Sequence, residues 1–188
     1  MKNNVFIIAE LSANHNGDIM VALDTIRAAK RAGADAVKIQ TYTADTLTID
    51  CKNDYFKINH GTAWDGEYLY DLYKRAYTPW EWHAKIFKVA NDEEIICFSS
   101  PFDNAAVDLL EELKTPIYKI ASFEIQDIPL ISYAASKGKP MILSTGIAEI
   151  EDIELAIDTC RKAGNNDITV LKCTSAYPAD PKDANLLT

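Results

Sequence analysis

The sequence predicts an α/β protein built from successive strand–helix units around a parallel sheet. Six short runs of β-branched and other apolar residues alternate with segments of helical periodicity. Most of the runs are apolar at nearly every position, as expected of strands that are covered on both faces. Polar residues follow most of the runs, at the end where α/β sheets and barrels bind ligands. The runs are residues 5–11, 36–41, 95–100, 117–122, 140–145 and 168–174.

Amphipathic helices are expected between the runs. Two stripes of apolar residues at helical spacing predict helices after the third and the fifth run. Asp18 and Asp103 are the expected N-caps of two helices, because a short carboxylate accepts hydrogen bonds from the free N–H groups there. A strict alternation of strand and helix is typical of the α/β class. The stripes are Ala106, Leu109, Leu110 and Leu113, and Ile150, Ile153, Ile157 and Cys160.

Two architectures fit this alternation, an open doubly wound sheet and a (β/α)8 barrel. The spacing of apolar residues along the sequence does not distinguish these two architectures. No Gly-x-Gly-x-x-Gly motif follows the first run, which disfavours a dinucleotide-binding sheet. Six runs are fewer than the eight strands of a barrel, so a barrel would lack two units within these residues.

Residues 44–78 form an insertion between the second run and the next long helix. The connection is far longer than the roughly 2–6 residues that are usual at this point. We expect an extra helix over residues 68–77. The insertion either packs on the domain as ordinary structure or acts as a lid or oligomer contact, and we favour a packed insertion that borders the ligand site. Its aromatic residues are Tyr55, Phe56, Trp64, Tyr68, Tyr70, Tyr73 and Tyr77.

Composition restricts the classes of partner. The formal net charge is −9, from 28 acidic and 19 basic residues, and an acidic surface repels nucleic acids and anionic lipids. No apolar run reaches the roughly 18 residues that a membrane-spanning helix requires, and the N-terminus lacks the pattern of a secretory signal. We therefore expect a cytoplasmic protein that acts on small molecules, without a nucleic-acid or membrane partner.

Neither the cysteines nor the histidines are spaced as metal ligands. The four cysteines include no CxxC pair, and Cys97 and Cys173 fall inside apolar runs, where buried, reduced thiols are expected. His15 follows the first run and either shapes that loop or contacts a substrate. His83, beside Trp82, is expected on a helix surface. These residues therefore predict no metal site.

Two lysines inside apolar runs, Lys38 and Lys119, indicate an anion-binding site, with Lys172 as a third candidate. A lysine is costly to bury unless it is paired or binds an anion. Hydroxyl groups at Ser100, Ser122 and Ser144 could complete a cradle for a phosphate or carboxylate. The alternative is that each lysine forms a salt bridge with a core carboxylate. Because lysines and hydroxyls recur together at the ends of the runs, we favour a phosphorylated or carboxylated ligand.

Glu10 and Glu124 are acidic residues at the ends of apolar runs. Each could position a lysine, or act as a general base on a hydroxyl group or a water molecule. We expect Glu10 to position a lysine. Glu124 follows its run, nearer the expected mouth of the pocket, and is the better candidate for chemistry.

Six motifs, in order along nearly the whole chain, resemble those of the sialic acid synthase family. Each is weak alone, and the six together are specific. Segments 10–15 and 61–65 and Ser175 resemble the pseudaminic acid synthase branch more than the N-acetylneuraminate synthases, which tend to have asparagine at the last position. The motifs are IAE (8–10) with NHNG (14–17), KIQT (38–41), SSPF (99–102), KIASFE (119–124), LSTG (143–146) and CTSAYP (173–178).

The resemblance implies a (β/α)8 TIM barrel that joins phosphoenolpyruvate to an open-chain N-acetylated amino sugar. The products would be a nonulosonic acid and phosphate, with cleavage of the C–O bond of phosphoenolpyruvate. Glu124 and Glu10 would be the catalytic residues, with Glu10 supporting the lysines. By position in the motifs, Lys38, Ser100, Lys119, Ser122 and Ser144 would bind phosphoenolpyruvate, and Gln40, Glu124 and Tyr177 would face the sugar.

The resemblance also implies parts beyond these 188 residues. Family members bind Mn²⁺ or Mg²⁺ through two histidines on later strands, and they carry a C-terminal antifreeze-like domain that covers the partner's active site in a homodimer. Residues 1–188 are therefore expected to be the N-terminal part of one barrel domain, truncated after about six βα units and without those metal ligands. Two alternatives remain, another phosphoenolpyruvate-dependent synthase of the deoxy-octulosonate phosphate type and a fragment that binds ligand without turnover.

Overall fold

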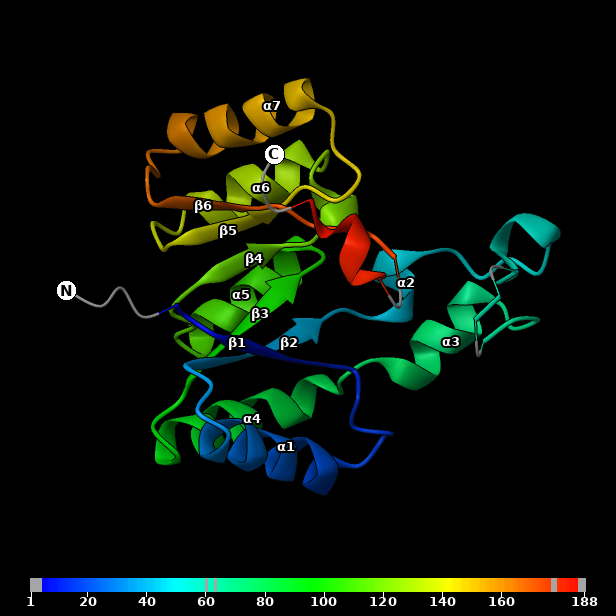
Figure 1. The fold of residues 1–188 in the computed structure, drawn as a ribbon, viewed down its shortest axis with the longest axis horizontal. Coiled ribbons are helices and arrows are strands. Elements are labelled where there is room, and N and C mark those ends of the chain that lie inside the picture. The colour runs from blue at the N-terminus through cyan, green and yellow to red at the C-terminus, as the bar shows by residue number, and fades with distance from the viewer. Residues whose placement is uncertain (1–4, 60, 63, 177–178, 186–188) are drawn as a thin grey trace. The chain divides into compact units, whose positions relative to one another are not determined.

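The computed structural model describes residues 5–59, 61–62, 64–176 and 179–185. The chain divides into two compact units at Leu113 and Lys114. Each unit contains three parallel strands with helices packed beside them (Figure 1). The predicted alternation of six strands with helices is confirmed. None of the helices in the described ranges is long and apolar enough to cross a membrane.

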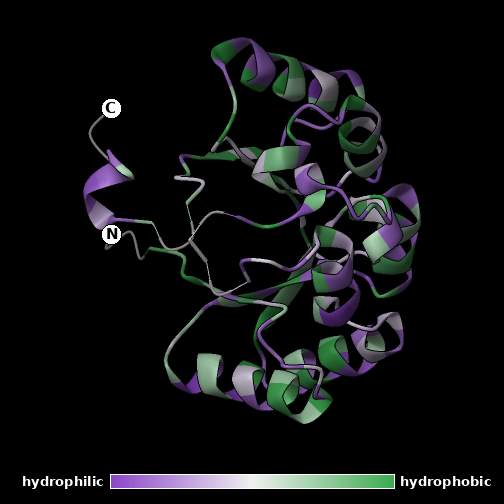
Figure 2. Cartoon of the chain, turned by 90° about the vertical axis from the view of Figure 1, so that its right-hand side faces the viewer, coloured by the Kyte–Doolittle hydropathy of each residue, from purple (hydrophilic) through white to green (hydrophobic). Residues whose placement is uncertain are grey.

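The first unit has its strands in the order β1-β2-β3. Its core lies between this sheet and the helices α1 and α4, where Leu23, Ile26, Ile39 and Ile86 are at most 2% exposed. Hydrophobic and hydrophilic residues alternate along both helices, the lowest in Figure 2, as amphipathic helices require. The elements are β1 (Ile8–Ser12), α1 (Ile19–Arg31), β2 (Ala36–Thr41), α2 (Ala44–Leu47), η1 (Asp54–Phe56), α3 (Leu69–Ala76), α4 (Trp80–Asp92), β3 (Ile96–Pro101) and α5 (Asn104–Glu112).

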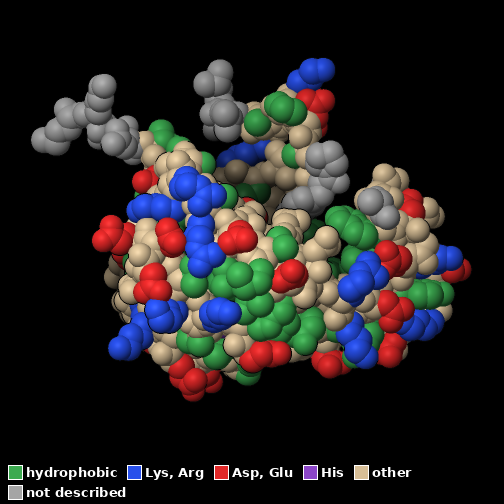
Figure 3. Space-filling model, turned by 90° about the horizontal axis from the view of Figure 1, so that it is seen from below, with side chains coloured by type: hydrophobic (Ala, Val, Ile, Leu, Met, Phe, Trp, Pro, Cys, Tyr) green, Lys and Arg blue, Asp and Glu red, His purple; other side chains and the backbone are tan. Residues whose placement is uncertain are grey.

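The surface over α1 and α4 carries charges of both signs. Figure 3 views the molecule from this side and shows basic and acidic side chains interspersed among hydrophobic ones. Arg27 of α1 contacts Asp24 at 2.8 Å and Glu93, at the end of α4, at 3.3 Å. The negative net charge therefore does not gather into a field of one sign on this face.

The C-terminal end of β1 contains a bulge. Glu10 pairs with Lys38 of β2, but Ser12, two residues further along β1, pairs with Ile39, only one residue further along β2. Ser12 has a left-handed backbone conformation, with φ of 49°. Bulges re-aim side chains near ligand sites, and here the Ser12 hydroxyl donates to Glu10 Oε1 at 2.6 Å.

The insertion meets the rest of the first unit at the C-terminal ends of β2 and β3. The helix predicted over residues 68–77 is confirmed as α3, and none of its residues is buried. Tyr73 of α3 lies edge-to-face with Tyr42, which directly follows β2 and contacts Phe102, directly after β3. Burial raises the pKa of the Tyr42 phenol to about 12. Tyr42 is thus a neutral packing residue at this junction.

The second unit has its strands in the order β4-β5-β6. Its helix α6 is the more apolar of the two long helices and buries Leu130, Ile131, Ala134 and Ala135. Gly164, after α7, has φ of +87° and ends that helix, as glycine does in a left-handed position. The elements are β4 (Tyr118–Ile120), η2 (Ser122–Glu124), α6 (Ile128–Ala135), β5 (Met141–Ser144), α7 (Ile150–Lys162), β6 (Ile168–Leu171) and η3 (Pro181–Ala184).

Two placements predicted from the sequence are wrong. His83, expected on a helix surface, is fully buried, because it shares with Ile86 and Ala90 the stripe of α4 that is turned inward. Ile150, expected in the apolar stripe of its helix, is 66% exposed. It is the first residue of α7, and the buried stripe of that helix consists of Ala156, Thr159 and Cys160.

Candidate functional site

Four of the predicted site residues lie together on β1, β2 and β3, and we call them the first-unit group: Glu10, Lys38, Gln40 and Ser100. In the sheet register, Glu10 is beside Lys38 and Gln40 is beside Ser100. Side chains alternate between the two faces of a strand, so Lys38 and Gln40 share one face of β2. The parallel sheet therefore brings these polar residues to one end of one face.

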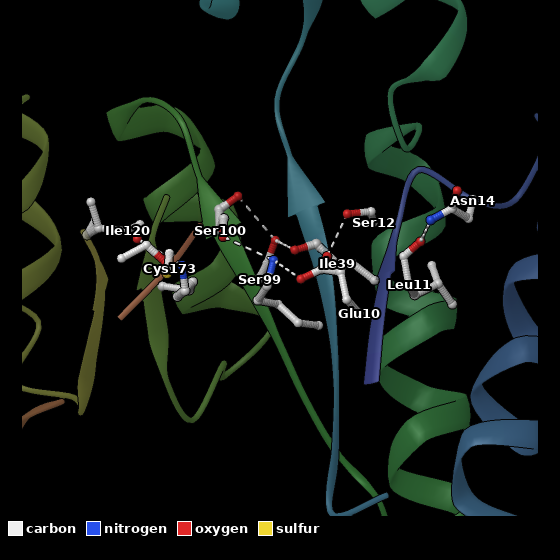
Figure 4. A network of polar contacts seen from close by, with 12 residues as sticks. Glu10, Leu11, Ser12, Asn14, Ile39, Ser99, Ser100, Ile120 and Cys173 are labelled. Carbon is white, nitrogen blue, oxygen red and sulfur yellow. Dashed lines mark hydrogen bonds and ion pairs between the residues drawn. The ribbon is translucent and has the colours of Figure 1, made fainter. Parts of the chain in front are cut away.

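Lys38 and Glu10 form an ion pair within this group. Lys38 Nζ lies 2.5 Å from Glu10 Oε2, and the two side chains are 12% and 45% exposed. Lys38 also donates to Ser100 Oγ at 3.5 Å. Figure 4 shows the contact between Glu10 and Ser12 beside β2, with Ser100 on the neighbouring strand. Lys38 therefore pairs with a carboxylate, as the alternative expects, but that carboxylate is exposed and not in the core. The ammonium group also keeps a third N–H to donate.

A second polar network lies on the opposite, buried face of β2 and β3. His83 Nδ1 lies 3.1 Å from the Pro79 carbonyl oxygen, and His83 Nε2 lies 2.9 Å from Thr41 Oγ1. Thr41 Oγ1 is 2.7 Å from Ser99 Oγ. Burial lowers the pKa of His83. In the neutral form that burial favours, Nδ1 donates to Pro79 and Nε2 accepts from Thr41, so the network ties α4 to the ends of both strands.

We predict that replacing His83 by glutamine lowers the free energy of unfolding of the first unit at pH 8 by about 1–3 kcal/mol, because buried polar groups lose their partners. The substitution should also remove part of the decrease in the free energy of unfolding that occurs at acidic pH. A histidine with a lowered folded-state pKa contributes stability that is present above the unfolded value of 6.5 and is lost as pH falls through the folded value. Urea titrations from pH 5 to 8, followed by tryptophan fluorescence, test this, because Trp64, Trp80 and Trp82 all belong to this unit.

The matched control for this prediction is Lys85→Gln, a substitution of an exposed residue on the same helix. It should leave both the stability and its pH dependence unchanged. If the free energy of unfolding depended equally on pH in the unsubstituted chain and in His83→Gln, the pH-dependent role of His83 would be contradicted.

The remaining described site residues form the second-unit group: Lys119, Ser122, Glu124 and Ser144. Lys119 is 7% exposed and donates to Ser144 Oγ and, at 3.0 Å, to the Ile120 carbonyl oxygen. Ser144 Oγ also accepts from Cys173 Sγ at 3.2 Å. With two donors on its oxygen, the Ser144 hydroxyl directs its own proton elsewhere. Lys119 and Ser144 therefore form a buried, donor-rich pair.

The loop after β5 is held to both neighbouring strands of the second unit. Thr145 Oγ1 donates to the Leu171 carbonyl oxygen, at the end of β6, at 2.9 Å. Gly146 N donates to Ser122 Oγ, beyond β4, at 3.2 Å. The loop therefore fixes the position of Ser122 as well as that of Ser144.

Glu124 ends the single 3-10 turn η2 that follows β4. Its Oε2 atom is buried and has no hydrogen-bond partner within the described ranges. Burial, with a smaller contribution from the charge of Asp127, raises the pKa of Glu124 to about 6. A hydrogen bond from its own backbone and, less strongly, the attraction of Lys119 oppose this only in part. A carboxyl group with a pKa near neutrality can both accept and release a proton, which suits general acid–base chemistry.

Several other polar residues have structural roles. His15 is buried, with Nε2 3.1 Å from Thr78 Oγ1 and its Nδ1 accepting from Gly17 N at 3.2 Å, so it shapes the first loop. Lys172 is exposed and donates to Thr174 Oγ1 at 3.0 Å. Cys97 is buried, which raises the pKa of its thiol to about 12. Tyr177, predicted to face the sugar, lies outside the described residues.

The chain resembles known synthases over almost all of its length. The model of the NeuB family matches residues 25–188. The pseudaminic acid synthase of Helicobacter pylori is 53% identical to this chain over 97% of the chain and 53% of that enzyme. The N,N'-diacetyllegionaminic acid synthase of Legionella pneumophila is 39% identical over 96% of the chain and 52% of that enzyme. This chain therefore spans about half the length of these curated relatives.

Solved structures give the same result. The N-acetylneuraminic acid synthetase of Leptospira borgpetersenii, solved with citrate, superimposes with a TM-score of 0.84 at 33% identity and covers 98% of this chain and 59% of that one. A phospho-2-dehydro-3-deoxyheptonate aldolase of Thermotoga maritima has a TM-score of 0.59 at 17% identity, which is a likeness of fold alone. The predicted α/β class with the strand order of a truncated TIM barrel and the predicted family resemblance are both confirmed.

Proposed function

Since this chain belongs to the NeuB family, we propose that it is the N-terminal part of a synthase that condenses phosphoenolpyruvate with an open-chain N-acetylated amino sugar. The products are a nonulosonic acid of the pseudaminic acid type and inorganic phosphate. The observation that carries the proposal is the buried Lys119–Ser144 pair at the end of β4 and β5. The identity of 53% to a pseudaminic acid synthase supports the choice of sugar class.

The proposed reaction has two bond-forming steps. C3 of phosphoenolpyruvate attacks the aldehyde carbon of the sugar, and positive charge develops at C2. Water then adds to C2, and the tetrahedral intermediate breaks its C2–O bond to release phosphate. One water molecule is consumed, and the sugar oxygen that was the aldehyde takes up a proton.

The second-unit group has the donors that an anionic substrate requires. The proposed role of Lys119, Ser122 and Ser144 is to bind the phosphate and carboxylate groups of phosphoenolpyruvate. Lys119 is supported in this role by its burial, since an ammonium group attracts an anion more strongly where water is excluded. Fixed donors also cost no reorganisation when charge develops during the reaction.

The first-unit group supplies further donors in the proposal. Lys38 and Ser100 bind phosphoenolpyruvate, and Gln40 faces the sugar, with Tyr177 as a second sugar contact. Glu10 acts through Lys38, because its carboxylate is held by the lysine ammonium at 2.5 Å and by the Ser12 hydroxyl at 2.6 Å. Glu10 therefore orients the ammonium group that the substrate meets.

Glu124 is the proposed general acid–base residue. It would deliver a proton to the sugar oxygen or remove one from the attacking water. Its pKa of about 6 supports both roles near neutral pH.

The proposal also includes a metal cofactor and the quaternary structure of the full-length protein. A divalent metal, Mn²⁺ or Mg²⁺, is expected for a synthase of this family, but the described residues contain no group of three or more His, Cys, Asp or Glu side chains that could hold one. No step above is therefore assigned to a metal held by these residues. We also propose residues 1–188 as one part of a single barrel domain, in a full-length protein that forms a homodimer in the cytoplasm.

The test follows the bridging oxygen of phosphoenolpyruvate. A full-length family protein that carries this chain as its N-terminal half is mixed with candidate N-acetylated amino sugars and with phosphoenolpyruvate labelled with ¹⁸O between C2 and phosphorus. We expect sugar-dependent release of phosphate that carries the label, because the C–O bond breaks. Release with phosphorylated, non-acetylated sugars instead would favour the deoxy-octulosonate phosphate type of synthase. Binding without release would favour a non-catalytic ligand-binding protein.

A further inference from the structure

Gly146, in the loop after β5, is a glycine for reasons of space and not of backbone conformation. The chain contains seven glycines, and the six others all have positive φ, between +69° and +93°, which favours glycine in itself. Gly146 has no such φ, so its φ does not require glycine. A Cβ atom on the six others would meet nothing within 4 Å. At Gly146 it would meet two serine side chains.

The space beside Gly146 is filled by hydroxyl groups. An ideal Cβ at position 146 would lie 2.0 Å from Ser175 Oγ and 2.9 Å from Ser122 Oγ, and 3.2 Å from Ser175 Cβ. The first contact is far below any real Cβ distance. The loop cannot simply retreat, because Thr145 Oγ1 is bonded to the Leu171 carbonyl oxygen at 2.9 Å. Any side chain at position 146 must therefore displace Ser175, Ser122 or the loop itself.

The main-chain N–H of Gly146 also sets the direction of one hydroxyl group. It donates to Ser122 Oγ at 3.2 Å and so occupies a lone pair of that oxygen. The Ser122 hydroxyl then presents its proton away from Gly146, as a donor. A donor is the form that an anionic ligand requires.

We propose that Gly146 is a positioning residue for phosphoenolpyruvate: its missing side chain lets two serines close around it, and its N–H turns the Ser122 hydroxyl into a donor for the ligand. The inference rests on the proposed function and adds to it a residue that does not itself touch the substrate. Gly146 acts through Ser122. It therefore affects the affinity for phosphoenolpyruvate and has little effect on the amino sugar.

The experiment is a double-mutant cycle between Gly146→Ala and Ser122→Ala, with the affinity for phosphoenolpyruvate measured by calorimetry on the chain. We expect Gly146→Ala to weaken binding by about 10- to 100-fold, as for the loss of one hydrogen bond to a charged group. The double variant should bind phosphoenolpyruvate with about the affinity of the single variant that binds it less tightly. Both changes remove the same donor, the Ser122 hydroxyl, so their effects should not add. In a full-length family protein, Gly146→Ala should raise KM for phosphoenolpyruvate and leave KM for the sugar unchanged.

The matched control is Gly138→Ala, which strains a positive-φ glycine of the same unit where a Cβ would meet nothing. It should lower the melting temperature but leave the affinity unchanged. Additive losses in the cycle, or a folded Gly146→Ala chain that binds as the unsubstituted chain does, would overturn the inference alone. Absence of phosphoenolpyruvate binding by an unsubstituted, folded full-length family protein that carries this chain would overturn the proposed function together with it.

Discussion

Replacing Lys119 by methionine is expected to lower phosphate release by about 100- to 1000-fold, the usual effect of removing one preorganised donor from a developing charge. Lys119 is 7% exposed, so water cannot replace its ammonium group. Methionine keeps most of the volume, and the loss of the donor to Ser144 and Ile120 should lower the free energy of unfolding by about 1–3 kcal/mol. Turnover should therefore fall far more than this change in stability explains in a protein that still folds.

The measurement is phosphate release by a full-length family protein that carries this chain, with calorimetric titration of phosphoenolpyruvate into the chain alone. Lys162→Met is the matched control, since Lys162 is an exposed lysine of the same unit, in the last turn of α7. It should leave both quantities unchanged. Turnover by Lys119→Met within about threefold of that of the unsubstituted protein would show that Lys119 does not act in the site.

Replacing Glu124 by glutamine is expected to lower turnover by about 100- to 10,000-fold, the range for loss of a general acid–base group. Its pKa of about 6 also predicts a limb in the pH profile of kcat/KM near pH 6. The limb should be absent from the variant, because an amide does not titrate. A Glu124→Gln protein with unchanged turnover would show that the carboxyl group has no part in proton transfer.

The same substitution is expected to stabilise the fold at alkaline pH. A folded-state pKa raised from 4.5 to about 6 means that the protonated carboxyl contributes stability below pH 4.5, which is lost as pH rises through about 6. At pH 8 the buried carboxylate of the unsubstituted protein is therefore destabilising. Glutamine should add about 1–2 kcal/mol to the free energy of unfolding at pH 8 and almost nothing at pH 4.

Thermal unfolding of the chain at both pH values, followed by circular dichroism, measures this difference. Glu154→Gln, at an exposed position on α7, is the control and should show no pH-dependent gain. If Glu124→Gln were stabilised equally at pH 4 and pH 8, the gain in stability would come from packing and not from removal of a buried charge. Loss of activity together with a gain in stability would separate the chemistry of Glu124 from any structural role.

The sequence predicted the strand–helix order, and it supplied the candidate site residues, because both depend on local pattern. A lysine inside an apolar run, such as Lys38 or Lys119, is visible from its neighbours alone. The alternation of strand residues then places Gln40 on the face of Lys38 without further information. Whether such a lysine binds an anion or pairs with a carboxylate of the protein depends on residues distant in the sequence. In the structure, Lys38 pairs with Glu10.

The features that the sequence did not reveal depend on contacts between distant residues. The polar partner that satisfies the buried His83 is Thr41, 42 residues away in the chain. The β1 bulge at Ser12 depends on the register with β2. The requirement for glycine at position 146 depends on Ser122 and Ser175, which come from two other segments. An aromatic neighbour such as Trp82 gives no guide to which side of a helix faces the sheet.

The bonds that join the loop after β5 to both neighbouring strands also bear on the thermodynamics of binding. Thr145, Gly146 and Ser144 are held by Leu171, Ser122 and Cys173, all internal partners of the protein. Rotamers fixed in this way lose little entropy when a ligand arrives, so most of the contact energy remains as affinity. Association should then follow single-step kinetics, with an observed rate proportional to ligand concentration and without the plateau that a slow loop closure imposes.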